Sequence, residues 1–155
     1  MGKVKLLLFV MLAAFLTAST GFAAETSFKA KLSPKDEVPA HKTKSSGKAE
    51  FKLSKDGKEL TYKLHVKDIL NASAAHIHHG KKGQNGPPVV GLLSQEKKGK
   101  FSGVISEGTL TDKDLIGSLQ GKTLEDLAQL IRSGETYVNV HTDAFPDGEI
   151  RGQIK

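Results

Sequence analysis

Apolar and polar residues alternate along most of the chain from residue 26 to 66. The apolar positions fall in three runs, which are Phe28, Ala30 and Leu32, then Ala49, Phe51 and Leu53, then Leu60, Tyr62, Leu64 and Val66. Lys, Glu, Ser and Thr occupy most of the positions between them. A period of two with one apolar side is typical of antiparallel strands that have one buried and one solvent-facing surface.

Turn and cap residues divide this pattern into elements. Asp56-Gly57 predicts a hairpin between the second and third runs, and Pro146-Asp147-Gly148 predicts a turn between strands in "YVNVHT" and "EIRGQI". A further strand is expected in "KFSGVISEGTL", and "TDKDLIGSL" predicts one or two extra helical turns. One helix is expected at about 123–133, with Thr123 as N-cap, Asp126 three residues later and Gly134 as the stop. The predicted fold is therefore all-β, a Greek-key β-sandwich or barrel of short antiparallel strands with one inserted helix.

The first residues of the chain predict export. Lys3 and Lys5 precede an apolar run from Leu6 to Leu16, and small residues follow up to Ala24. This order is typical of a secretory signal peptide over residues 1–24, and the run is too short for a spanning helix. We therefore expect a periplasmic or secreted protein, with no transmembrane segment in the mature chain, and a single domain over residues 25–155.

Composition narrows the classes of function. The chain has no cysteine, so neither a disulfide framework nor a thiolate metal site is available. Loss of Lys3 and Lys5 with the signal peptide lowers the formal charge of +6 by two. The remaining lysines fall on alternate strand positions and in loops, which indicates a solvated surface. Because arginines and aromatic residues are few, nucleic acid is not an expected partner, and the charge supports no more than weak attraction of small anions.

Three of the six histidines lie within four positions, in "AAHIHHG". His76 and His78 are two apart and therefore point to the same side of a strand, opposite to Ile77. In "YVNVHT" the apolar Val138 and Val140 leave His141 on the other side, and in "EIRGQI" Arg151 likewise lies opposite the apolar residues. We therefore expect His76, His78, His141 and Arg151 on the outer wall of the sheet, where the three histidines could hold a metal ion.

Ligand chemistry favours copper for such a site. Neutral imidazole suits copper, zinc, nickel and iron, and at equal availability the affinity order favours copper over zinc. Asp143, two residues after His141, is the expected carboxylate to orient an imidazole. The alternative is a hydrogen-bonded structural cluster or loop anchor. His79 points away from the pair, His65 lies on a wet strand face, and His41 lies in a polar connection from which it could swing in as a fourth ligand.

Four stretches together resemble the CHRD domain, a module first named in chordin and common in exported bacterial proteins. They are "LSPKDEVPAHKTKSSGKAEFKL", "DGKELTYKLHV", "AAHIHHGKKGQNGPPVVGLL" and "GETYVNVHTDAFPDGEIRGQI", and the resemblance extends over about residues 26–155. It implies an extracytoplasmic module, which in chordin-like proteins belongs to a binding protein, and it implies no particular reaction.

A more distant resemblance is to copper–zinc superoxide dismutases, Greek-key barrels whose copper is held by an H-x-H strand and a later histidine. "AHIH", "NVHT" and "GEIRGQI" are similar to the copper elements in the same chain order. The resemblance implies His76, His78 and His141 as copper ligands and Arg151 as a guide for a small anion. The zinc half has no counterpart, because the chain lacks the cysteines and the histidines between His79 and His141.

Two functions from different classes follow. The first is an exported metal-binding protein, with copper favoured and superoxide-dismutase-like one-electron chemistry as an extension. The second is a non-catalytic module that binds another protein or an envelope component, in which the histidines and Asn139 pin the Gly-rich loop 80–88. Hydrolysis is disfavoured, because Asp143, Asp147 and Glu149 lie in or beside a Pro-Asp-Gly turn that already explains them.

Overall fold

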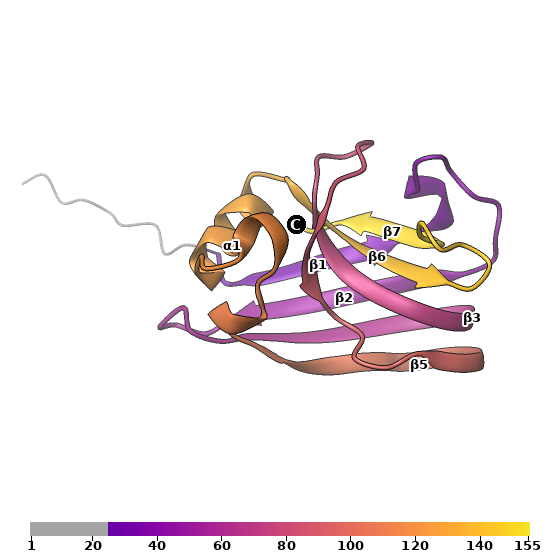
Figure 1. Cartoon of the computed structure of the whole chain (residues 1–155), viewed down its shortest axis with the longest axis horizontal. Coiled ribbons are helices and arrows are strands. Elements are labelled where there is room, and N and C mark those ends of the chain that lie inside the picture. Colours follow the sequence, from indigo (N-terminus) through magenta and orange to yellow (C-terminus); the bar gives the residue numbers. More distant parts are fainter. Residues whose placement is uncertain (1–24) are drawn as a thin grey trace, which may run out of the picture.

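The computed structural model describes residues 25–155 (Figure 1), and the predicted signal peptide, residues 1–24, lies outside them. The strands are β1 (Ser27–Leu32), β2 (Ser46–Leu53), β3 (Leu60–His79), β4 (Pro88–Gly91), β5 (Lys97–Leu110), β6 (Thr136–Thr142) and β7 (Ile150–Gln153). The helical elements are α1 (Leu124–Arg132) and the 3-10 turns η1 (Pro34–Asp36), η2 (Asp112–Asp114) and η3 (Gly117–Leu119). The two short turns before α1 correspond to the predicted helical turns in "TDKDLIGSL".

β3 is the strand around which the sheet is built. Its first part pairs with β2, its last part pairs with β6 and β4, and β5 pairs with it from Leu60 to Ala72. β5 pairs along one edge of β3. The opposite edge of β3 pairs first with β2 and then with β6. The 20-residue strand thereby joins two groups of antiparallel strands, where the sequence pattern had predicted separate short strands.

The first and last strands bring the barrel close to closure. Lys29 and Lys155 exchange backbone hydrogen bonds of 2.7 and 2.9 Å, and Ser33 and Arg151 form an antiparallel bridge. β1 pairs with β2 on its other side and β7 pairs with β6. The strand order β1-β2-β3-β6-β7 therefore returns to its start, and the expected all-β barrel with one helix is confirmed.

Bulges in β3 change which residues face the core. Leu64 and Val66 point inward at even positions, whereas Ala75 and Ile77 point inward at odd ones. Register shifts interrupt the pairing between Val66 and Ile69, between Leu70 and Ala72 and between Ala72 and Ala74. Each extra residue moves the following side chains to the other face. Successive buried side chains are three residues apart from Val66 through Ile69 and Ala72 to Ala75, and these three steps leave Ile77 in the core and the neighbouring histidines outside it.

Local side-chain bonds fix the bulges. Asp68 and Asn71 have φ values of 57° and 52°, a left-handed conformation that these two residue types tolerate better than most. The backbone N–H of Asp68 donates to the Ser102 hydroxyl at 2.9 Å, and Asn71 Oδ1 accepts from the Gly99 backbone at 2.7 Å. Both bonds connect β3 to β5, so the bend of β3 and its longest pairing support each other.

The helix closes one end of the barrel, and Figure 1 shows the connection between β1 and β2 at the other end. Thr123 and Asp126 form the predicted capping box, with the threonine hydroxyl accepting from the Asp126 backbone at 3.2 Å. Leu127 and Ile131 are buried against the strands. Within residues 25–155, no helix has the length and apolar character needed to cross a membrane.

The closure between β1 and β7 gives a stability prediction. A Cβ at Gly152 would overlap the Lys31 carbonyl oxygen, so Gly152→Ala has to push the two strands apart. We expect this variant to lose roughly 1–3 kcal/mol of unfolding free energy in urea, the usual effect of overpacking. Gly91→Ala is the control, because no heavy atom lies within 4 Å of its Cβ position, and it should change stability by less than about 0.5 kcal/mol. Equal stability of the two variants would contradict a tight contact at this closure.

Candidate metal centre

His76, His78 and His141 lie on one face of two paired strands. His76 is opposite Asn139 in the register of β3 and β6, and His78 is opposite Tyr137. One ring nitrogen from each of the three histidines lies within 4.8 Å of the others. Metal–imidazole bonds of about 2.0–2.1 Å in a tetrahedral site place nitrogens about 3.3–3.4 Å apart, so the side chains would move closer together on sharing an ion. The three histidines that the sequence pattern selected are therefore brought together.

Backbone carbonyls determine which ring nitrogens carry protons. His78 Nδ1 lies 2.8 Å from the Gly86 carbonyl oxygen, and His141 Nδ1 lies 2.8 Å from that of Pro146. A carbonyl oxygen only accepts, so both Nδ1 atoms donate and both Nε2 atoms hold a lone pair in the neutral rings. His76 Nδ1 then donates to His141 Nε2 at 3.2 Å. A metal ion would take up the His141 lone pair in place of that proton.

The lone pair on His78 Nε2 is buried and accepts no hydrogen bond from the described residues. His78 is 8% exposed, and its Nε2 has no hydrogen-bond partner among the described residues. Buried polar atoms without a partner are rare and costly, and a bound ion would supply the partner that this nitrogen lacks. The orientation of His78 by the Gly86 carbonyl matches the arrangement in which a ligating imidazole donates its other N–H to a fixed acceptor.

The rings are kept neutral. Burial lowers the pKa of His78 to about 4, and it also lowers the pKa of His76 and of His141. The proximity of His76 and His141 lowers the pKa of His76 further. Since only neutral imidazole binds a metal, all three side chains are in the ligating form at neutral pH.

The histidine face lies outside the barrel core but is partly covered by other segments of the chain. This face, on which His76, His78, Asn139, His141 and Arg151 lie, is opposite to the core as expected, but Asn139 and Arg151 are each only 2% exposed. Segment 33–45 and loop 80–87 fold over it and contact each other, since the Asn85 side chain donates to the Val38 carbonyl at 2.9 Å. These two connections therefore cover part of the face, a burial that the alternation does not predict.

Arg151 is one of the residues that hold loop 80–87 in place. Its guanidinium donates to Asn85 Oδ1 at 2.8 Å and to the Gln84 carbonyl, and it lies 3.5 Å from the centre of the Tyr137 ring. The other face of Tyr137 stacks on His78, with ring centres 4.9 Å apart. Arg151, Tyr137 and His78 therefore form a continuous stack beside the histidine cluster, and Arg151 makes no ion pair with Glu149, Asp143 or Asp147.

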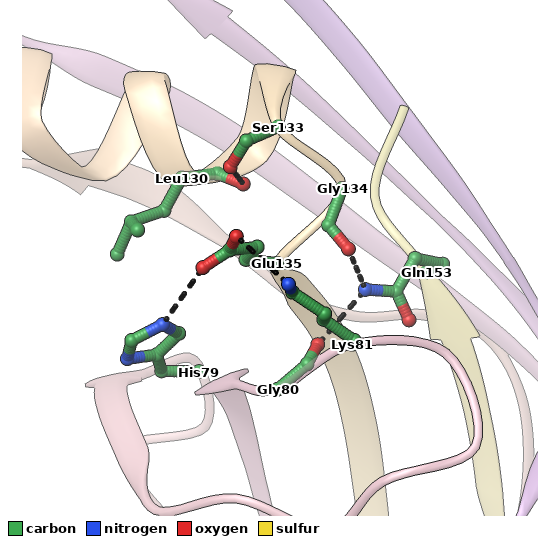
Figure 2. A network of polar contacts seen from close by, with 8 residues as sticks. All are labelled: His79, Gly80, Lys81, Leu130, Ser133, Gly134, Glu135 and Gln153. Atoms are coloured by element: carbon green, nitrogen blue, oxygen red, sulfur yellow. Dashed lines mark hydrogen bonds and ion pairs between the residues drawn. The ribbon is translucent and has the colours of Figure 1, made fainter.

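The base of the same loop is fixed separately. Figure 2 shows Gln153 donating to the carbonyls of Gly80 at 2.9 Å and of Gly134 at 2.8 Å. His79 and Lys81 both approach Glu135, at 3.4 and 3.5 Å. His79 therefore points away from the cluster, as its position in the strand predicted.

The other predicted residues are distributed around the site. His41 packs against Phe145 with ring centres 4.5 Å apart, and His65 is part of the first half of β3. Neither belongs to the group of histidines that could share an ion. Asp143 pairs with Lys98 instead of orienting His141, which is oriented by the Pro146 carbonyl.

Glu37 is a buried acid that the sequence pattern did not reveal. Its Oε1 accepts from the Asn139 side-chain amide at 2.6 Å, and burial raises its pKa to about 7, with opposing contributions from Arg151 and Asn139. Glu37 lies in the polar segment 33–45, and nothing in its neighbouring residues predicts burial. Because Asn139 lies between His76 and Arg151 across the strands, Glu37 links segment 33–45 to the middle of the histidine face.

The fold and the cluster define a β-barrel protein with a covered three-histidine centre. The model of the CHRD domain family matches residues 28–154, and the chain therefore belongs to this family. No curated protein and no solved structure matches the chain. The family and the barrel are thus established, and the chemistry of the centre has to be argued from its own residues.

The raised pKa of Glu37 predicts a pH-dependent difference between two variants of the metal-free protein. A raised folded-state pKa means that the carboxyl group favours folding at low pH, and this contribution is lost as the pH rises from 4.5 through about 7. In Glu37→Gln the amide oxygen can still accept from Asn139 without titrating. We therefore expect this variant to gain stability relative to the wild type as the pH rises from 5 to 8, measured by urea unfolding. Parallel stability curves would contradict a buried titrating carboxyl group.

Proposed function

We propose that the protein binds one transition-metal ion, copper in preference to zinc, through His76, His78 and His141. The observation that carries the proposal is the buried, unpartnered Nε2 of His78 beside the other two imidazoles. Three neutral nitrogen ligands on paired strands form a donor set that is rigid on the protein side. Such a set leaves coordination positions for an exogenous ligand.

The choice of copper follows from the donors. The group contains only imidazole, without a carboxylate, and the chain has no cysteine. Imidazole ligands suit both copper and zinc, so the softness of the ligands does not select between the two ions. The general affinity order for divalent ions favours copper. Export from the cytoplasm, which the N-terminal sequence predicts, would give the protein access to copper outside the cell.

Superoxide-dismutase-like chemistry is a separate extension of this proposal. It requires that the metal cycle between oxidation states and that Arg151 attract a small anion. The guanidinium of Arg151 is already bonded to loop 80–87, so the arrangement supports a role in holding that loop more directly than a role at an open anion site.

A second function is favoured by the hydrogen bonds of the cluster. His78 anchors Gly86, and His141 anchors Pro146, without any metal. The histidines would then be structural parts of a non-catalytic extracytoplasmic module that binds another protein or an envelope component.

Copper titration distinguishes the two functions. We expect purified mature protein to bind one equivalent of Cu²⁺ with nitrogen ligands visible by electron paramagnetic resonance. Binding to the folded state alone should stabilise it by about 2.7 kcal/mol at 100 times the dissociation constant. Emission from Tyr137, stacked on His78, should be quenched in a Tyr62→Phe background, since the chain has no tryptophan and only two tyrosines.

Variants of the histidines provide the matched control. The double variant His76→Ala, His141→Ala should no longer bind the one equivalent of Cu²⁺. The double variant His41→Ala, His65→Ala should still bind it. Binding that survives the first pair, or a wild type without binding, would exclude the metal site and leave the structural function.

The role of Arg151 is tested independently. Arg151→Met should release loop 80–87, increase amide exchange at Asn85 and Gly86, and weaken copper binding about 10- to 100-fold, because the Gly86 carbonyl orients His78. A variant with unchanged copper affinity and slower superoxide decay would instead support the anion-guiding role.

A further inference from the structure

A basic hollow lies on a part of the barrel that the metal proposal does not use. Its volume is about 1020 Å³, and it extends over β1, β2 and the first part of β3 to Lys82 and Gly83 in loop 80–87. Among the described residues that line it are seven lysines and two acidic residues, Asp36 and Glu50. Within that set only Lys48 is ion-paired, with Glu50 at 3.0 Å. The hollow therefore has a large excess of positive charge.

The strand register places these charges next to one another. Lys31 is directly opposite Lys48. Like charges in opposite positions of a sheet are destabilising. Lys67 lies two positions beyond His65, opposite Ser46, and Lys29 lies opposite Glu50, which pairs with Lys48; neither Lys29 nor Lys67 makes an ion pair among the described residues. An anionic ligand would relieve this repulsion.

The geometry indicates an extended ligand with regularly spaced charges. Adjacent strands are about 4.8 Å apart, and alternate residues of one strand are about 6.8 Å apart. The lysine ammonium groups therefore form a field of separate point charges, unlike the convergent set that would surround one phosphate. The volume also corresponds to a ligand at the upper end of the usual small-molecule range.

The lining excludes several anionic partners. Among residues 25–155, no Phe, Tyr or Trp lines the hollow, so this part of the chain offers no surface there for base stacking. Arg151 is buried and bonded to loop 80–87, so no arginine fork is available for phosphate. The apolar residues of the lining, among them Leu32 and Val66, are buried, so nothing can insert into a bilayer.

We propose that this hollow binds a linear acidic polysaccharide, with carboxylate groups of successive sugars meeting the lysines of β1, β2 and β3. The proposal does not depend on the metal centre, because none of the three histidines of the cluster lines the hollow.

The test is titration of the full mature protein with polygalacturonate oligomers. Lys29→Gln, Lys31→Gln and Lys67→Gln are combined in one variant, and Lys52→Gln, Lys55→Gln and Lys58→Gln, which lie outside the hollow, form the control with the same change in charge. We expect at least a tenfold loss of affinity in the first variant and less than a threefold loss in the control. Binding should weaken with added salt, and neutral dextran should not bind.

Thermal unfolding separates loss of binding from loss of folding. Since Lys31→Gln removes a like-charge pair and Lys29→Gln removes a charge opposite Glu50, the hollow variant should melt near the wild-type temperature. Equal polygalacturonate affinity of the hollow variant (Lys29→Gln, Lys31→Gln, Lys67→Gln) and the wild type would overturn the proposal. An equal loss of affinity in the control variant would also overturn it. Tighter binding of single-stranded oligothymidylate or of anionic vesicles than of polygalacturonate would also overturn it.

Discussion

The apolar side chains of β3 have to reach the core on both sides of the bend that joins the two groups of strands, and the rest of the structure depends on how this is achieved. A regular strand of 20 residues would keep even positions inward throughout, which would direct His76 and His78 into the core. The irregularities at Asp68, at Asn71 and between Ala72 and Ala74 together reverse the phase before Ala75. The same irregularities therefore bury Ile77 and create the histidine face.

That face gains its chemical character from the connections above it. Segment 33–45 and loop 80–87 exclude water from His78 and Asn139, and this desolvation holds the imidazoles in the neutral form. The same connections supply the carbonyl of Gly86, which fixes the proton of His78 on Nδ1. Burial and orientation thus act together, since a neutral ring with a directed lone pair is what a metal ion requires.

The sequence pattern predicted the features that depend on neighbouring residues. Alternation identified the strands other than β4, Thr123 and Asp126 identified the start of the helix, and H-x-H identified the cluster. The continuity of β3 was not predictable, because "LNAS" has the composition of a turn and its bulges are stabilised by Ser102 and Gly99 on another strand. Burial of Arg151 and Glu37 was missed for the same reason, since it requires contacts between residues that lie more than 65 positions apart.

The exceptions to local rules are concentrated in two regions. The core residues of the barrel are mostly apolar, whereas two of the three buried side-chain atoms without a partner among the described residues, on His78 and Asn139, lie on the histidine face and the third is on Thr136. The hollow places Lys31 against Lys48, another arrangement that costs stability. Local conflicts that a fold tolerates are expected where a ligand resolves them. An ion would satisfy His78 and an anionic chain would neutralise the lysines, so each of the two proposals places a ligand where the fold leaves such a conflict.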